Sequence, residues 1–161
     1  MPIPLSVLRR HAPDALLGML MSSEANFSGW ADPRGVELEV SRIMYPSPRA
    51  EADQLVGGAF HHFERYFLRY LEGPRHALES LHQRAANDAR HKNVSILRVE
   101  KIGRRTFSPG TMSYAGIRTE LFDLKRHRGV DSFNPRLFTE EMICDVLALF
   151  RGSFRARAAR A

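Results

Sequence analysis

The stretch "RYFLRYLEGP" (residues 65–74) reads as a strand followed by the turn that ends it. Successive side chains of a strand point to opposite faces of the sheet. One face holds Phe67, Arg69 and Leu71, and the other holds Tyr66, Leu68 and Tyr70. Both faces are apolar apart from Arg69, which indicates a central strand covered on both sides. Because an unpaired buried cation costs several kcal/mol, we expect Arg69 to face an anion.

The neighbouring segments place this strand in a larger pattern. "LVGGAFHHF" (55–63) is a second strand-like run directly before it, and the short spacing predicts a hairpin. Gly57 and Gly58 indicate a bulge or a close backbone approach. After Pro74, apolar residues recur at helical spacing as far as Ala85, so we predict a helix there.

The rest of the chain supplies further elements. We predict strands over 15–23 and 94–102, and a final strand within 104–117. Asp32-Pro33 has the pattern of a helix start, with residues 46–54 as its exit loop. Thr139 is the expected cap of a last helix that ends near Arg151, with Gly152 as its stop. Residues 118–134 are charged and give no clear pattern.

Strand, helix, strand, strand, helix, strand is the order of the ferredoxin-like fold. We therefore predict an α+β domain, βαββαβ with an extra strand, with two helices on one sheet face and a C-terminal helix covering the other. The expected divisions are a leader (1–15), the domain (16–117), a helical extension (118–152) and a basic tail (153–161).

Composition limits the classes of function. The chain has 161 residues, a formal charge of +6 and a pI of about 10.1, but much of the excess charge lies in the last residues, and no nucleic-acid-binding motif accompanies it. No apolar run approaches the roughly 20 residues needed to cross a bilayer. Cys144 is the only cysteine, so no internal disulfide can form, and we expect a cytoplasmic protein.

Catalytic and metal-binding patterns are missing from the sequence. It holds no nucleophile elbow, phosphate-binding loop or paired-carboxylate motif, so we do not expect an enzyme. His61 and His62 are adjacent on a predicted strand and point to opposite faces, so they cannot chelate one ion together.

Several segments resemble one known family, the BLUF domains, which sense blue light with FAD. The hairpin and the second helix carry the most specific similarity. The matching segments are "LEGP" (71–74), "DARH" (88–91), "VGGAF" (56–60), "RTFSPGTMSY" (105–114) and "GMLMSSEA" (18–25). The resemblance covers about residues 16–116 and implies the ferredoxin-like fold, FAD as cofactor and a signalling role with a protein partner.

The chain departs from the family at the positions of its photochemistry. In the family, light moves an electron and a proton from a tyrosine to the flavin, and a glutamine then rearranges its hydrogen bonds. Met21 stands at the tyrosine position and Arg69 at the glutamine position. Ala50 and Glu51 stand where paired asparagines hold the flavin ring, whereas the family's methionine is kept as Met112.

These changes favour a light-insensitive regulatory module that acts through protein contacts and has lost FAD. A flavin-binding sensor with altered chemistry remains an alternative, because Arg90 and His91 lie where the family places the ligand. Asp88, Arg90 and His91 could instead organise the turn before the next strand. A third hypothesis is a receptor for another anionic ligand, held by Arg69 and Arg90. If the pocket fills itself, Glu51 is the expected partner of Arg69. The partner is expected to be a protein or a second copy of this chain, and neither a membrane nor nucleic acid.

Overall fold

The computed structural model describes residues 1–26 and 51–160, without the side chains of residue 51 and residues 156–159. The strands are β1 (Leu16–Ala25), β2 (Gly57–Phe63), β3 (Tyr66–Pro74), β4 (His91–Lys101) and β5 (Met112–Tyr114). The helices are α2 (Glu51–Leu55), α3 (Arg75–Asn87), α4 (Arg118–His127) and α5 (Glu140–Arg160), with short 3-10 helices η1 (Leu5–Arg10) and η2 (Pro135–Leu137). The predicted helix that begins at Asp32 lies outside the described residues.

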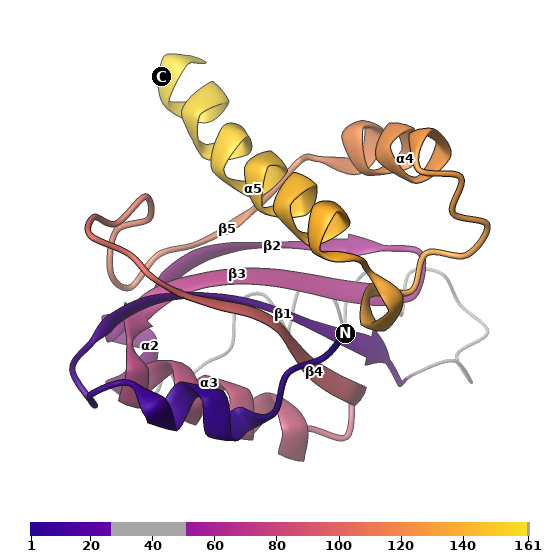
Figure 1. Cartoon of the computed structure of the whole chain (residues 1–161). Coiled ribbons are helices and arrows are strands. Elements are labelled where there is room, and N and C mark those ends of the chain that lie inside the picture. The colour runs from indigo at the N-terminus through magenta and orange to yellow at the C-terminus, as the bar shows by residue number, and fades with distance from the viewer. Residues whose placement is uncertain (27–50, 161) are drawn as a thin grey trace.

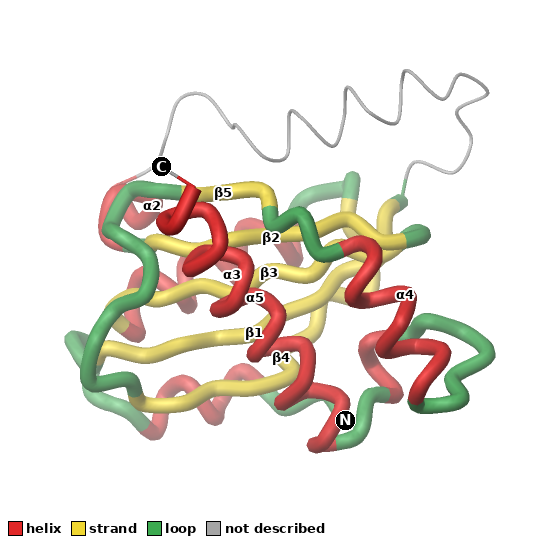
Figure 2. The backbone as a smooth tube through the Cα atoms, turned by 90° about the horizontal axis from the view of Figure 1, so that it is seen from above, coloured by secondary structure: helices red, strands yellow, loops and turns green. Residues whose placement is uncertain are grey.

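The five strands form one sheet in the order β4-β1-β3-β2-β5, with β3 at its centre (Figures 1 and 2). All neighbours are antiparallel except β2 and β5, which run parallel. This arrangement confirms the predicted ferredoxin-like α+β fold with an added strand. The predicted hairpin is also present, as β2 pairs with β3 from Gly57↔Glu72 to Phe63↔Tyr66.

Two hydrophobic cores cover the two faces of the sheet. Helices α2 and α3 lie on one face, and α5 crosses the other face with α4 beside it (Figure 1). Leu71 of β3 belongs to the first core, whereas Leu68 and Tyr70 belong to the second. The alternation in "RYFLRYLEGP" therefore reflects a central strand with protein on both faces, as predicted.

The local sequence explains where the helices begin. Pro74 has an extended backbone and precedes the first residue of α3, where its fixed φ suits the entry to a helix. Thr139 caps α5, since its hydroxyl oxygen accepts a hydrogen bond from the Met142 amide at 3.2 Å. The charged segment that gave no clear pattern contains α4, whose buried residue Leu121 anchors it to the core.

Two sequence predictions about helix ends are wrong. Helix α5 continues through Gly152 to Arg160, so residues 153–160 are helical and Gly152 is not a stop. A single glycine costs a helix only about 1 kcal/mol, which packing of the preceding turns outweighs. The predicted exit loop also contains the short helix α2.

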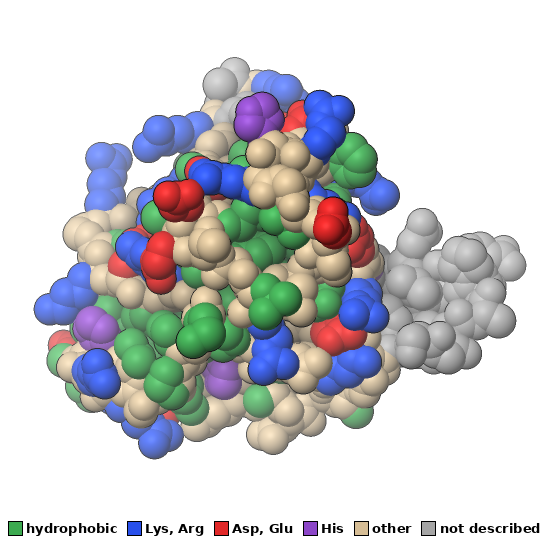
Figure 3. All heavy atoms as spheres, turned by 45° about the vertical axis from the view of Figure 1, so that its right-hand side comes forward, with side chains coloured by type: hydrophobic (Ala, Val, Ile, Leu, Met, Phe, Trp, Pro, Cys, Tyr) green, Lys and Arg blue, Asp and Glu red, His purple; other side chains and the backbone are tan. Residues whose placement is uncertain are grey.

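One face of the molecule is mixed in charge. On the face shown in Figure 3, Lys and Arg side chains are interspersed with Asp, Glu and hydrophobic side chains. Cys144 is exposed on α5. Among the residues that the structure describes, no helix is long and apolar enough to span a membrane, and no group of His, Cys, Asp or Glu side chains is placed to hold a metal ion.

Candidate functional site

A cavity of about 280 Å³ lies on the sheet face that α2 and α3 cover. Strands β2, β3 and β5 contribute its sheet side, and α3 with the turn after it contributes the opposite wall. The described lining residues are Asp53, Val56, Phe60, Arg69, Leu81, Arg84, Ala85, Asp88, Arg90, His91, Gly110, Thr111 and Met112. The cavity thus combines an apolar surface with several charged groups, as ligand sites do.

Arg69, on the central strand β3, lines the sheet side of this cavity. Its neighbours in register are Met21 of β1 and Phe60 of β2. The side chain is enclosed by protein yet keeps some accessible surface, and burial lowers the pKa of its guanidinium to about 10. Arg69 therefore remains a cation at neutral pH. Among the described side chains, none lies within hydrogen-bond or ion-pair distance of it.

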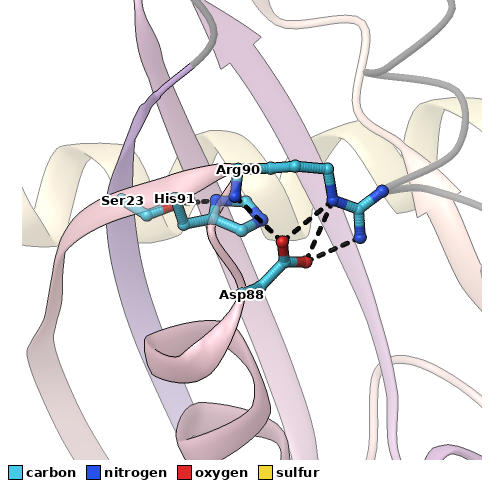
Figure 4. Close-up of polar contacts among 4 residues, drawn as sticks. All are labelled: Ser23, Asp88, Arg90 and His91. Carbon is cyan, nitrogen blue, oxygen red and sulfur yellow. Dashed lines mark hydrogen bonds and ion pairs between the residues drawn. The ribbon is translucent and has the colours of Figure 1, made fainter.

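The turn between α3 and β4 holds a compact group of polar residues (Figure 4). Asp88 accepts hydrogen bonds from the Arg90 backbone amide at 3.0 Å and from its guanidinium at 2.6–3.1 Å. These bonds hold the pKa of Asp88 below its usual range. Asp88 and Arg90 thus organise the turn, as one of the two sequence interpretations proposed.

His91 continues this group toward β1. Its Nδ1 atom shares a hydrogen bond with the Ser23 hydroxyl at 2.8 Å (Figure 4), and its ring lies edge-on to Phe67. Burial lowers the pKa of His91 to about 4, and the nearby Arg69 acts in the same direction. His91 is therefore neutral at pH 7.

A second ion pair links the two helices that form one wall of the cavity. The Arg84 guanidinium of α3 donates to both carboxylate oxygens of Asp53 on α2, with one of these distances 3.2 Å. The two described carboxylates that line the cavity, Asp53 and Asp88, are therefore each paired with an arginine other than Arg69.

The structure brings most of the sequence-predicted site residues together. Arg69, Arg90, His91 and Met112 all line the cavity. Met21 is buried in the core on the same sheet face, but it is not a lining residue. Ala50 and the Glu51 side chain lie outside the described residues, so the predicted Glu51–Arg69 pair stays a prediction.

Sequence reasoning missed Asp53 and Arg84 of the helical wall, and it gave Asp88 only a role in the turn. Leu81, Arg84, Ala85 and Asp88 follow the spacing i, i+3, i+4 and i+7, which places them on one side of a helix. That spacing was a usable signal, but only the apolar members of the stripe suggested burial. Asp53 carried no comparable signal, because its segment read as a loop.

Glu72, in the "LEGP" segment at the end of β3, was also missed. It is 1% exposed, and its carboxylate accepts the backbone N–H groups of Thr106 and Phe107 at 2.7 and 2.9 Å. Arg105 donates to the Glu72 carbonyl oxygen at 2.9 Å. These bonds fix the start of the segment that continues to Gly110, Thr111 and Met112 in the cavity wall.

Comparisons with known proteins agree with this fold. The family model described as sensors of blue light using FAD matches residues 21–113, which is more than half of the chain. The photoactivated adenylate cyclase subunit beta of Euglena gracilis is 31% identical over 70 residues. That match covers 44% of this chain and only 8% of the Euglena protein.

Solved structures show the same architecture. The dark-state structure of BlrB, a BLUF protein, matches with a TM-score of 0.61 and 19% identity, covering 88% of this chain and 99% of BlrB. The photo-activated BlsA structure matches with a TM-score of 0.65 and 19% identity, covering 86% of this chain and 94% of BlsA. The matched family model, together with the sheet order and the position of the cavity, shows that this chain belongs to the BLUF family.

Proposed function

We propose that this chain is a sensory and regulatory module that does not respond to light and that acts by contacting a protein partner. The observation that carries the proposal is Arg69, a cation on the sheet side of the cavity, next in register to Met21. By resemblance, these are the family's glutamine and tyrosine positions.

The side chains at these two positions do not supply the groups that the family's photochemistry with FAD requires. A guanidinium offers only hydrogen-bond donors, so Arg69 cannot alternate between donating and accepting as an amide does. Met21 has no hydroxyl group from which a proton could leave. The chain's own residues can enclose a ligand and present a positive charge to it, but neither side chain supports the family's light-driven exchange. We therefore propose that FAD is not the working ligand.

Protein contact is supported by apolar side chains on the outer elements. Phe122 on α4 is 57% exposed, and Tyr114 on β5 and Phe154 on α5 are also exposed. Exposed apolar side chains mark a site of protein association where they form a contiguous patch. The partner in this proposal is a protein or a second copy of the chain, in the cytoplasm, where the lone exposed Cys144 would stay reduced. Catalysis is not part of the proposal.

Each of two alternative functions is supported by a specific observation. A flavin-binding sensor with altered chemistry is favoured by the retained cavity, which still contains His91 and Met112. A receptor for a different anionic ligand is favoured by Arg69, which has no carboxylate partner among the described side chains.

Visible absorption separates these functions. The purified protein is incubated with FAD, freed of unbound cofactor by gel filtration and measured before and after blue light. The proposal expects no reversible spectral change and no stoichiometric flavin. Retained flavin without a light response favours the altered-chemistry alternative, and a reversible red shift contradicts the proposal.

A further inference from the structure

The charges of the cavity do not balance. Three arginines and two aspartates line it, and His91 is neutral at pH 7. Arg84 is paired with Asp53 and Arg90 with Asp88, so both described carboxylates are engaged. Arg69 supplies the positive charge that remains uncompensated among the described lining residues.

The rest of the lining limits the size and polarity of a ligand. Val56, Phe60, Leu81, Ala85 and Met112 give the cavity an apolar surface around this one charge. Its volume of about 280 Å³ lies just below the range of roughly 300–1,000 Å³ that is typical of small-molecule sites. A small ligand with an apolar body therefore matches these residues better than a dinucleotide does.

We propose that this cavity binds a small monoanionic ligand, with its oxyanion group held by Arg69 and its apolar body packed on Phe60 and Met112. The planar guanidinium presents paired N–H donors that match a carboxylate, phosphodiester or sulfonate. Burial in the sheet fixes the arginine before the ligand arrives, so little side-chain entropy is lost on binding. Arg90, which the sequence also suggested for this role, is engaged by Asp88 and forms part of the wall. The inference rests on the proposed function, because it requires a cavity that FAD does not fill.

A pair of dyes tests the role of the charge. Anilinonaphthalene sulfonate is a monoanion with an apolar body, and phenylnaphthylamine is its neutral analogue. We expect the wild-type protein to bind the anionic dye on the order of tenfold more tightly, as a charged hydrogen bond allows. Arg69→Gln should remove this preference and leave the affinity for the neutral dye within about twofold. The readout is dye fluorescence titrated against folded protein, with folding checked by circular dichroism.

Two further variants keep the result interpretable. Arg104→Gln makes the same substitution at an exposed position outside the cavity and should change neither affinity. Arg69→Lys keeps the charge without the planar guanidinium and should retain part of the preference for the anionic dye. This variant takes the place of Arg69→Gln if Arg69→Gln does not fold.

Three outcomes overturn the inference: neither dye binds, both bind equally, or the preference survives in Arg69→Gln. Neither dye would bind if the cavity were already filled by an internal partner, such as the Glu51 side chain predicted from the sequence. That failure leaves the proposed light-insensitive function standing. Stoichiometric FAD with a reversible light response instead contradicts the proposed function, whatever the dyes show.

Discussion

Arg69 and Tyr70 are consecutive residues of β3 that contact opposite sides of the sheet. Arg69 lines the cavity, whereas the Tyr70 hydroxyl accepts a hydrogen bond from Arg151 of α5 at 3.2 Å. The Arg151 guanidinium also pairs with Glu100 of β4 and lies 5.3 Å from the centre of the Tyr70 ring. A ligand bound to Arg69 would therefore contact β3 at the residue next to Tyr70, which bonds to α5.

Arg151→Met should loosen this attachment. We expect the free energy of unfolding to fall by about 1 kcal/mol, because the ion pair is partly exposed and screened by solvent. Urea denaturation of Arg151→Met, Tyr70→Phe and the double variant gives the coupling between the two residues, expected at about 0.5–1 kcal/mol. Arg126→Met, which removes an exposed pair with Asp123, is the matched control and should change little. Additive single effects would show that the contact does not stabilise α5.

Glu72→Gln should be more costly, because the buried carboxylate accepts two backbone N–H groups at once. Both donors reach the same oxygen, Oε2, so an amide oxygen could still accept them, but two charge-assisted hydrogen bonds would become weaker neutral ones. We expect a loss of about 2 kcal/mol in the free energy of unfolding. Glu140→Gln, at a carboxylate that is 75% exposed, is the control. Equal midpoints in urea for the two variants would mean that Glu72 does not anchor the segment.

Gly57→Ala should also be destabilising. An added Cβ at Gly57 would lie 2.7 Å from the Phe107 carbonyl oxygen and still closer to that of Ser108, so the 107–108 backbone would have to move. We expect a loss of about 1–3 kcal/mol, as for overpacked cores. Gly152→Ala makes the same change in open space within α5 and should stabilise the protein by about 0.5–1 kcal/mol. Thermal denaturation of both variants measures whether each one is destabilised or stabilised. An unchanged stability of Gly57→Ala would contradict the close approach of Gly57 to the 107–108 backbone.

Stability should fall in mild acid because of two histidines, His91, which is buried, and His62, which is partly buried. Burial lowers the pKa values of His62 and His91 from 6.5 to about 4, so both stay neutral in the folded protein while the unfolded chain takes up protons. The stability that they contribute is complete above pH 6.5 and is lost as the pH falls to about 4. Each histidine adds a slope of up to about 1.4 kcal/mol per pH unit in that window.

His62→Phe checks this pH dependence. Its free energy of unfolding, measured in urea across that window, should fall less steeply than that of the wild type. Phe122→Leu, a change at an exposed position that removes no titrating group, should keep the wild-type slope. If all three proteins give the same slope, His62 titrates normally in the folded state.

Local patterns predicted the sheet well. Apolar alternation, the short gap before Tyr66 and the Gly73-Pro74 ending determined the hairpin and the start of α3, because each depends on residues close in sequence. The end of α5 was not predictable in this way. Its continuation past Gly152 depends on contacts with residues far away in the sequence, such as the contact of the Phe154 ring with the Phe107 ring.

The site was predictable only in part. The family resemblance singled out Arg69, Arg90, His91 and Met112, and all four line the cavity. It could not show that Arg90 is paired with Asp88, because Arg90 could equally have faced a ligand. The same holds for Arg84, whose partner Asp53 lies 31 residues away in sequence and meets it only in the folded protein.

The light-minus-dark difference spectrum of the protein equilibrated with FAD tests the central claim most directly. The claim is that Arg69 and Met21 have replaced the light switch of the BLUF family. We predict a flat difference spectrum across the blue absorption band. A flavin red shift that forms under blue light and decays in the dark would contradict the claim.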